Sequence, residues 1–340
     1  MGALPSSTRP LSASPTPSPT SSAPSQPLPS SSQLVFPPPL NVSGPLIDLH
    51  DPSVCQGPGG ELYLFSTGIG LPMRVSYDQG DSWSIGSPVF PDGAPAAAVP
   101  FLGGDANGPL WAPDCTYLAG VKEFVLYYAA STLGSQHSGI FLATTTAPLS
   151  GKWSDGGVVL ESNTSVDWNA IDPHLVVEKE GGWWMSFGSF WSGIKLIQLD
   201  PTTKKTLNSE IISIATRTEN HGAIEGSFVV QASNNWWLFA SFDACCSGLS
   251  STYSIHVSRS TSSIEGPYVD KNGKPALNGG GTLLLGTHEG VLAPGGQSVW
   301  FNEGRKKWEM VYHYITKDVR FKVAFNNLDF GTSDGWPVVV

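Results

Sequence analysis

Four carboxylates and one carboxamide recur along this chain of 340 residues in similar settings of small and apolar residues. They are Asp51 in HDPSV, Asp114 in WAPDC, Asp172 in NAIDPH, Glu225 in AIEGSF and Gln297 in GGQSV. Any single Asp of this kind could simply cap a turn. Charged residues, however, make up only 14% of the chain, so four carboxylates at one repeated position favour a function. Carboxylates crowded together repel one another, and proteins keep such groups for metal binding or acid–base chemistry.

The elements that must position these residues also repeat. A short apolar strand follows each polar residue after 10 or 11 residues, and a second strand comes after it. We predict first strands at 62–65, 124–128, 183–187, 236–239 and 308–312, and second strands near 73–77, 140–144, 194–199, 253–258 and 321–325. A propeller blade has four strands in roughly 40–60 residues, so the pattern predicts an all-β, five-bladed β-propeller. Because the innermost strand of each blade faces the central channel, the five polar residues should meet at one axial spot.

The composition excludes several classes of function. A net charge of −10 and a pI of about 5.1 are unlike the basic surface of a nucleic-acid-binding protein. No stretch approaches the ~18 apolar residues of a membrane span. Four cysteines are too few for a disulfide scaffold and lack the spacing of a zinc site. Residues 1–36 are rich in Ser, Pro and Thr and are predicted to be a disordered tether, with the propeller domain at 37–340.

Other catalytic motifs are scarce. Residues 76–83, SYDQGDSW, fit the S-x-D-x-G-x-[ST]-W motif of sialidase-like propellers, which is usually a structural turn. It occurs once, and the six arginines include no trio placed for a sialic acid carboxylate. No G-x-S-x-G, H-E-x-x-H, P-loop or dinucleotide fingerprint points to other chemistry. Low charge with abundant Trp, Asn and Ser favours a neutral polysaccharide, whose hydroxyls need hydrogen-bond partners and whose apolar faces pack on aromatic rings.

Taken together, eight motifs resemble glycoside hydrolase family 43, in particular its endo-1,5-α-L-arabinanases of fungal type. In order, and covering about residues 45–338, they are HDPS at 50–53, WAPD at 111–114, NAIDP at 169–173, GSFW at 188–191, IEGS at 224–227, CC at 245–246 through RS at 259–260, PGGQSV at 294–299 and YHY at 312–314. The resemblance implies a five-bladed β-propeller, in agreement with the repeat count. It also implies an inverting hydrolase that cleaves internal α-1,5-L-arabinofuranosidic bonds of arabinan.

By this resemblance, Asp51 is the general base, Glu225 the general acid, and Asp172 the residue that orients the acid and modulates its pKa. Inversion needs room for a water molecule, so the carboxyl groups of base and acid should lie roughly 6.5–9.5 Å apart. A charge on Asp172 should raise the pKa of Glu225 by repulsion. Asp114 is assigned a structural role, in which it accepts backbone N–H groups. The substrate-binding residues expected are Trp111, Asn169, Ser189, Phe190, Trp191 and His313.

The resemblance leaves the metal content open. Members of the family often carry a calcium or similar ion on the axis, and many bacterial members hold it through a His in G-P-G-H-x-S-V. Gly296 stands at the matching position here, and Gln297 follows it. We therefore expect no required cofactor, with axial calcium as an open alternative that His313 or water could serve. A histidine on a strand can equally be a core residue or a substrate contact.

The four cysteines could form disulfides, which would indicate an oxidising, extracellular environment. Cys245 and Cys246 could form a vicinal disulfide or stay as two buried thiols. Cys55 and Cys115 each follow an axial carboxylate in neighbouring blades, so they could come within the disulfide reach of ~4.4–6.8 Å between Cα atoms. We expect a secreted, extracellular protein, although no signal peptide is visible after Met1.

The partner expected is arabinan or a pectin side-chain polysaccharide, with no nucleic acid and no membrane, and the chain is expected to be a monomer. Two alternatives stay open. One is an exo-acting arabinofuranosidase or xylosidase of the same family, because the loops on the channel face decide between a groove and a pocket. The other is a catalytically inactive propeller that binds glycan. The presence of all three matching carboxylates argues against this second alternative.

Overall fold

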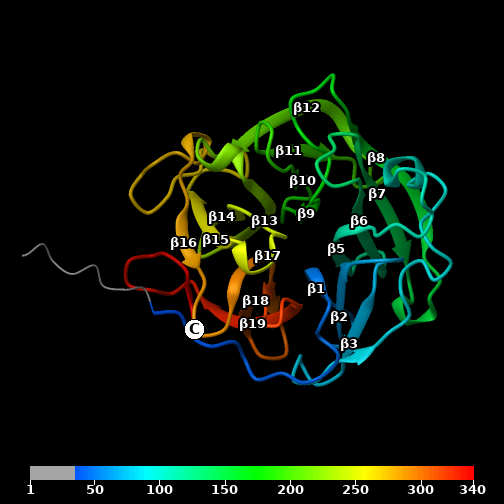
Figure 1. The fold of residues 1–340 in the computed structure, drawn as a ribbon, viewed down its shortest axis with the longest axis horizontal. Coiled ribbons are helices and arrows are strands. Elements are labelled where there is room, and N and C mark those ends of the chain that lie inside the picture. Colours follow the sequence, from blue (N-terminus) through cyan, green and yellow to red (C-terminus); the bar gives the residue numbers. More distant parts are fainter. Residues whose placement is uncertain (1–34) are drawn as a thin grey trace, which may run out of the picture. The chain divides into compact units, whose positions relative to one another are not determined.

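The computed structural model describes residues 35–340, which form five four-stranded antiparallel sheets around a central axis (Figure 1). Each sheet is one contiguous stretch of chain, and its strands follow one another from the axis outward. The all-β, five-bladed β-propeller predicted from the repeat is therefore confirmed. Among residues 35–340 there is no helix long and apolar enough to cross a membrane.

The first blade consists of β1 (His50–Gln56), β2 (Leu62–Thr67), β3 (Met73–Ser76) and β4 (Ser84–Ile85). The second consists of β5 (Trp111–Leu118), β6 (Glu123–Ala130), β7 (Ser138–Thr145) and β8 (Ser154–Ser162). The third consists of β9 (His174–Val177), β10 (Trp183–Phe187), β11 (Ile194–Leu199) and β12 (Thr206–Ala215). The fourth consists of β13 (Ile224–Ala232), β14 (Asn235–Phe242), β15 (Ser254–Ser260) and β16 (Thr282–Leu285). The fifth consists of β17 (Leu292–Asn302), β18 (Lys307–Ile315), β19 (Phe321–Asp329) and β20 (Val338–Val339).

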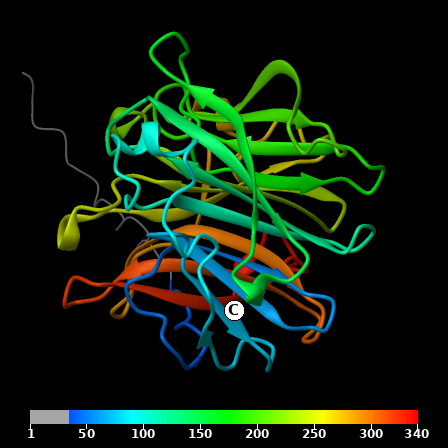
Figure 2. The same cartoon turned by 90° about the vertical axis from the view of Figure 1, so that its right-hand side faces the viewer.

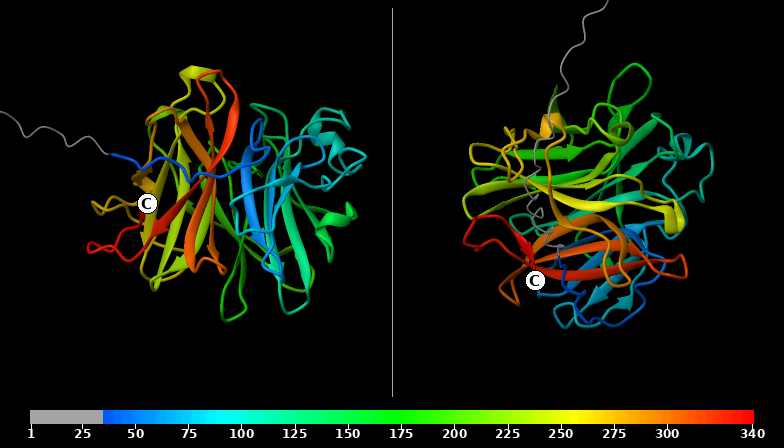
Figure 3. Two further views of the ribbon diagram at one scale, coloured as in Figure 1. Left: turned by 90° about the horizontal axis from the view of Figure 1, so that it is seen from below. Right: turned by 60° about the vertical axis from the view of Figure 1, so that its left-hand side comes forward.

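Five short 3-10 helices lie in the connecting loops of the described chain: η1 (Val99–Leu102), η2 (Pro148–Ser150), η3 (Asn220–Gly222), η4 (Gly248–Ser250) and η5 (Ala276–Asn278). The ten strands expected from the sequence are the second and third strands of the five blades. Seen from the side, the sheets are twisted and their strands run between two faces that carry the loops (Figures 2 and 3). The loops on one face can therefore surround the mouth of the channel.

The core consists of the apolar layers between neighbouring blades. The middle strands are covered on both sides, which explains why they are almost continuously apolar. Every residue of β10 is buried, and in β6 only the first residue, Glu123, is not fully buried. Trp237 is completely buried, and its indole N–H donates to the carbonyl of Ala232 at 3.1 Å. Trp184 is also buried, so both tryptophans pack between blades, as their place in the strands predicts.

The ring is closed by the segment 40–48, which runs along β19 of the last blade. Leu40 N–H donates to the carbonyl of Phe325 at 2.7 Å, and Asp48 N–H donates to that of Phe321 at 2.8 Å. The composition placed Phe36 in the tether, but its ring lies 5.5 Å from that of His288 and packs against the core of the last two blades. Residues 1–34 of the predicted tether lie outside the described residues.

Two disulfides link the four cysteines. Cys55 of β1 is joined to Cys115 of β5 with 5.5 Å between their Cα atoms, and it connects the inner strands of the first two blades. Cys245 is joined to Cys246 in the loop between β14 and β15. Of the alternatives left open by the sequence, the vicinal disulfide is the one found.

The segment 76–83 forms a structural turn. The Asp78 carboxylate accepts hydrogen bonds from the hydroxyl of Ser76 and from the backbone and hydroxyl of Ser82. The indole of Trp83 donates to the carbonyl of Gly80 at 3.1 Å. Because its polar groups bond one another, this motif stabilises the outer edge of the first blade.

Candidate active site

Each blade has a left-handed residue two positions before regular pairing of its inner strand begins, and in the fifth blade Ala293 is left-handed as well. The five residues at this shared position are Asp51 (φ +46°), Ala112 (+42°), Asp172 (+55°), Gly226 (+59°) and Gly296 (+57°). Two residues further on, regular pairing with the second strand begins at Ser53, Asp114, His174, Phe228 and Ser298. In four of the blades the register shifts just before this point. A bulge of this kind bends the strand and redirects the side chains next to it.

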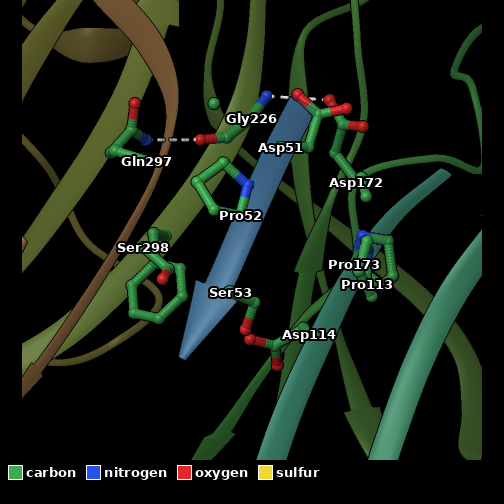
Figure 4. A pocket seen from close by; sticks show the side chains of 13 residues that line it. Asp51, Pro52, Ser53, Pro113, Asp114, Asp172, Pro173, Gly226, Gln297 and Ser298 are labelled. Carbon is green, nitrogen blue, oxygen red and sulfur yellow. Dashed lines mark hydrogen bonds between the residues drawn. The ribbon is translucent and has the colours of Figure 1, made fainter. Parts of the chain in front are cut away.

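This common backbone frame corrects the alignment of the five polar residues. Asp51 and Asp172 occupy the left-handed position itself. Glu225 precedes that position by one residue, whereas Gln297 follows it by one and Asp114 by two. Two residues along a strand correspond to about 6.6 Å, so Asp114 belongs to a deeper layer. Four of the five residues, Asp51, Asp114, Asp172 and Gln297, line one axial pocket, as expected, but Asp114 lies deeper in it than the others (Figure 4).

Asp114 belongs to a buried network of hydrogen bonds below the channel mouth. One carboxylate oxygen accepts the Leu175 N–H at 2.7 Å, and the other lies 3.2 Å from Nδ1 of His174. Nε2 of His174 lies 2.9 Å from the carbonyl of Val229, and its ring stacks on Phe228 at 3.5 Å. Asp114 thus ties the second blade to the third. These contacts are those of the structural role expected for it.

Asp51 is held by three polar neighbours at the channel mouth. The hydroxyl of Thr67 donates to Oδ2 at 2.7 Å, and Nδ1 of His50 lies 2.8 Å from the same oxygen. The Asp51 backbone N–H donates to Nδ1 of His313 at 3.2 Å. Burial alone would raise the pKa of Asp51, but the two histidines and Thr67 outweigh it and lower the pKa to about 2. Asp51 is therefore ionised throughout the neutral and mildly acidic range.

Glu225 lies in a different environment. Ser189 donates a hydroxyl hydrogen bond to Oε2 at 2.8 Å, and Tyr253 donates one to Oε1 at 2.9 Å. These bonds lower its pKa, but burial is the largest effect, and together with the charge of Asp51 it leaves the pKa raised. Sequence reasoning assigned the rise to Asp172. Burial is the main cause instead, because the carboxyl group is removed from water whatever the state of its neighbour.

Asp172 accepts the Gly226 N–H at 2.9 Å, and Figure 4 shows it facing Asp51 across the channel mouth. The amide of Gln297 donates to the Gly226 carbonyl at 2.6 Å, so the residue that follows Glu225 is held through both its N–H and its carbonyl. Burial raises the pKa of Asp172 well above its usual value, and the charges of Glu225 and Asp51 raise it further. Three carboxyl groups this close cannot all be charged, so Asp172 and Glu225 retain protons that Asp51 has lost.

A pocket of about 490 Å³ opens beside Glu225. Besides Glu225, it is lined by five of the six residues expected to contact substrate, namely Trp111, Asn169, Ser189, Phe190 and Trp191. Leu133 and His221 from neighbouring loops also line it, and the spacing of the repeat did not indicate them. The exposed indole of Trp191 and exposed Leu133 supply the apolar surface that a sugar ring needs.

His313 is the expected substrate residue that the structure places elsewhere. Its side chain is almost completely buried, and its ring stacks on His50 with 3.9 Å between ring centres. Burial lowers its pKa well below the usual value, and the neighbouring His50 lowers it further. His313 is therefore a neutral acceptor that holds the backbone of Asp51, because strand β18 brings it beneath the base.

Sequence reasoning also missed two residues that hold the catalytic carboxyl groups. Thr67 is the last residue of β2, and its hydroxyl accepts the Ala112 N–H at 2.8 Å while it donates to Asp51. Tyr253 directly precedes β15 and donates to Glu225. Neither lies on an inner strand, where the repeat directed attention. A polar residue at the channel-mouth end of a second or third strand of a blade is the signal that could have indicated them.

The donor set at the channel mouth does not fit a calcium ion. Calcium takes six to eight oxygen ligands. The amide oxygen of Gln297 already accepts the Ser241 hydroxyl at 2.8 Å, and its nitrogen donates to Gly226. The group formed by His50, Asp51 and His313 offers nitrogen as two of its three ligand atoms. A Cβ at Gly296 would lie 2.6 Å from Oδ1 of Asp51, so no side chain fits there.

The fold and this site define a class of protein: a β-propeller enzyme with carboxyl groups of opposite protonation beside a pocket suited to sugar. The family model of glycosyl hydrolases family 43 matches residues 45–337. The chain belongs to this family and is a glycoside hydrolase.

Three similar proteins extend this result. The extracellular endo-α-(1→5)-L-arabinanase 1 of Bacillus subtilis is 39% identical, over 85% of this chain and 87% of its own. The extracellular exo-α-(1→5)-L-arabinofuranosidase ArbA of Cellvibrio japonicus is 35% identical, over 86% of each. A solved GH43 endo-arabinanase from Bacillus licheniformis has a TM-score of 0.79 and 39% identity, covering 88% of this chain and 99% of its own.

Proposed function

We propose that the chain is an inverting endo-1,5-α-L-arabinanase that hydrolyses internal bonds of arabinan. The observation that carries the proposal is the contrast between two carboxyl groups in one site. Asp51 has a pKa of about 2, whereas the pKa of Glu225 is raised. A base and an acid are thus available at the same pH, which glycoside inversion requires. The similarity to endo-arabinanases supplies the substrate class.

Asp51 acts as the general base. Its Oδ2 is engaged by Thr67 and His50, whereas its Oδ1 lies 3.6 Å from the neutral His313. Oδ1 therefore has capacity to accept a proton from a water molecule that attacks the anomeric carbon. As the water loses this proton, its oxygen forms the new bond at the face opposite the leaving group.

Glu225 acts as the general acid. It borders the pocket that contains Trp111 and Trp191, so its carboxyl group can reach a glycosidic oxygen of a bound chain. Its proton passes to the departing oxygen as the glycosidic bond breaks. Ser189 and Tyr253 each donate to one of its oxygens and stabilise the carboxylate that forms. Asp172 holds the Gly226 peptide and thereby the backbone from which Glu225 projects.

The experiment that tests the proposal is product analysis on debranched arabinan, with p-nitrophenyl arabinofuranoside in parallel. An endo-arabinanase releases mixed arabino-oligosaccharides and acts poorly on the aryl arabinoside. Release of arabinose alone would establish the exo activity that one relative has. Binding to arabinan without hydrolysis would establish an inactive glycan-binding propeller. Inversion is tested by proton NMR of the first product, whose anomeric configuration must be opposite to that of the substrate.

We also infer that the protein acts outside the cell. Two relatives carry the word extracellular in their names. The two disulfides agree with this, because disulfides persist in oxidising compartments. The partner is then arabinan in plant cell-wall material.

A further inference from the structure

The Cys245–Cys246 disulfide reaches the edge of the site, although the mechanism above does not use it. The Sγ atom of Cys245 lies 3.4 Å from Nε2 of His50, and that of Cys246 lies 3.7 Å from the same nitrogen. The disulfide belongs to the loop between β14 and β15, whereas His50 is the first residue of β1. Cys245 and His50 are 195 residues apart in sequence, so this contact brings the fourth blade against the first.

The other sides of the His50 ring are also occupied. Nδ1 faces Oδ2 of Asp51 at 2.8 Å. One ring face stacks on His313 at 3.9 Å, and Phe321 meets the ring edge-on at 4.4 Å. The disulfide covers the remaining nitrogen. The imidazole cannot turn away from Asp51 without displacing one of these groups.

We propose that the Cys245–Cys246 disulfide is a positioning element for the base, because it closes the outer nitrogen of His50 and holds the imidazole against Asp51. The inference rests on the proposed function, in which Asp51 is the base. A disulfide has no hydrogen to donate and is a weak acceptor, so Nε2 of His50 faces it best as an N–H group. With Nδ1 directed at a carboxylate, His50 is then protonated on both nitrogens.

The charge on His50 has a consequence for Asp51. The titratable groups that face His50 are Asp51 on its own strand, His313 on β18 and Glu225 on β13. Burial lowers the pKa of His50, but the charge of Asp51 and its hydrogen bond to His50 are the main effects that outweigh it, and the net pKa is raised. If thiols or hydroxyls replaced the disulfide, they could donate to Nε2 and favour neutral His50. Asp51 would then lose part of the positive charge that lowers its pKa.

The test compares the wild type with the double variant Cys245→Ser/Cys246→Ser on debranched arabinan across the pH range. We expect kcat to fall about tenfold, as for residues that orient a catalytic group, with KM unchanged. We also expect the acid limb of the pH profile to move up by about 1 pH unit, since a nearby opposite charge lowers a carboxyl pKa by that much or more. The matched control is Ser247→Ala, which removes a hydroxyl bonded to the Cys245 carbonyl and keeps both sulfurs.

A second arm uses the wild type under a phosphine reductant. Cys246 is exposed and lines a pocket of about 240 Å³, so the reductant has access. Each phosphine takes up the oxygen of one water molecule and becomes a phosphine oxide, while the disulfide gains two electrons and two protons. The double variant retains only Cys55–Cys115, so a loss of kcat in the wild type that is absent from the variant isolates the vicinal pair.

Three outcomes decide the inference. A folded double variant with the kcat and acid limb of the wild type overturns it. If that variant does not fold, unchanged kcat in wild type whose vicinal disulfide is shown by mass spectrometry to be reduced overturns it. NMR titration of His50 is independent of the substrate: the inference requires a lower His50 pKa after reduction, and an unchanged one refutes it. An inactive wild type on arabinan would instead count against the proposed function.

Discussion

Asp51 and Glu225 differ little in intrinsic acidity, and their surroundings separate them. Asp51 is buried against two histidines and a threonine hydroxyl, which lower its pKa to about 2. Glu225 is buried with only neutral donors, Ser189 and Tyr253, and its pKa is raised. The reaction needs an ionised base and a protonated acid. Activity should therefore be lost as pH falls through the pKa of Asp51 and as it rises through that of Glu225.

Asp51→Asn and Glu225→Gln should each lower kcat on arabinan by about 10²–10⁴-fold, the usual contribution of general acid–base groups. Both replacements keep the volume of the side chain and one oxygen acceptor. The thermal midpoint should therefore change little, and circular dichroism checks that the fold is retained. Turnover near that of the wild type in either variant would refute the assignment of that residue.

Asp172→Asn should lower kcat on arabinosides with poor leaving groups and leave the alkaline limb of the pH profile close to that of the wild type. Burial and the charges of Glu225 and Asp51 raise the pKa of Asp172 well above its usual value, so its carboxyl group is already neutral where Glu225 titrates. The amide of the variant is also neutral, and its oxygen still accepts the Gly226 N–H. Arabinosides with good leaving groups should be less affected, because they need little protonation by the acid. A clear shift of the alkaline limb towards acid would mean that Asp172 carries a charge beside the acid, and an equal loss on both substrates would mean that it does not act through the acid.

The inner strands position the chemistry through one backbone feature that all five blades share. A left-handed residue lies at or near the start of each inner strand, the register shifts beside it in four blades, and regular pairing begins two residues after it in all five. We call the left-handed position the upper level and the position where pairing begins the lower level. The residue types at these two levels decide the role of each blade. Asp51 and Asp172 lie at the upper level, whereas Asp114 and His174 link two blades at the lower level.

Asp114→Ala should destabilise the fold without changing the chemistry. Its removal leaves the Leu175 N–H and one nitrogen of His174 buried without a partner, which costs about 1–3 kcal/mol. Urea unfolding should show this loss, while the pH profile of kcat on the remaining folded enzyme keeps both limbs. A shifted limb would instead place Asp114 in the catalytic layer.

Gly296→Ala tests the upper level. Gly296 has a φ of +57°, and an added Cβ would lie 2.6 Å from Oδ1 of Asp51 and 2.7 Å from the His313 ring. The variant should lose about 1–3 kcal/mol of stability from the left-handed backbone and should have a lower kcat because Asp51 is displaced. Gly273→Ala is the control, since its φ is +81° and nothing lies within 4 Å of the added carbon. If both variants keep wild-type kcat, the space beside Asp51 is not critical.

Closure of the ring of blades depends on contacts between the two ends of the described chain. Each blade is contiguous in sequence, so the first and last blades are joined by packing and by the segment 40–48 along β19. Leu46 of this segment and Leu49 just after it are almost completely buried in the core between these two blades. The carboxyl groups of the site come from the first, third and fourth blades, so their geometry depends on a closed ring.

One truncation and one substitution test this closure. A chain that starts at Val35 should keep its Tm and kcat, because the composition of residues 1–34 predicts no contribution to the core. A chain that starts at Pro52 or later would lack Asp51, so the second variant is Leu46→Ala in the full chain. Loss of this buried leucine should cost about 2–5 kcal/mol and lower the Tm by several degrees. An unchanged Tm in Leu46→Ala would show that the segment does not stabilise the ring.

The sequence by itself determined the number of blades, the second and third strand of each blade, and the three carboxyl groups of the site. These follow from local hydrophobic patterns and from short motifs, which a chain carries wherever it folds. The site residues Asp51, Asp172 and Glu225 and the pocket residues around Trp111 were found in this way. The pairing of Cys55 with Cys115 also followed, as one possibility, from equivalent places in neighbouring blades.

The tertiary structure decided the depth of each side chain and its partners across blades. Asp114 looks like Asp51 in sequence but lies two residues further along its strand. The sequence did not show this difference, because Asp, Ala and Gly each adopt the left-handed position in one blade or another. His313 holds the backbone of the base because β18 of the last blade packs against β1 of the first. The contact between His50 and the vicinal disulfide spans 195 residues. Such contacts depend on how the closed ring brings distant loops together, which no local pattern encodes.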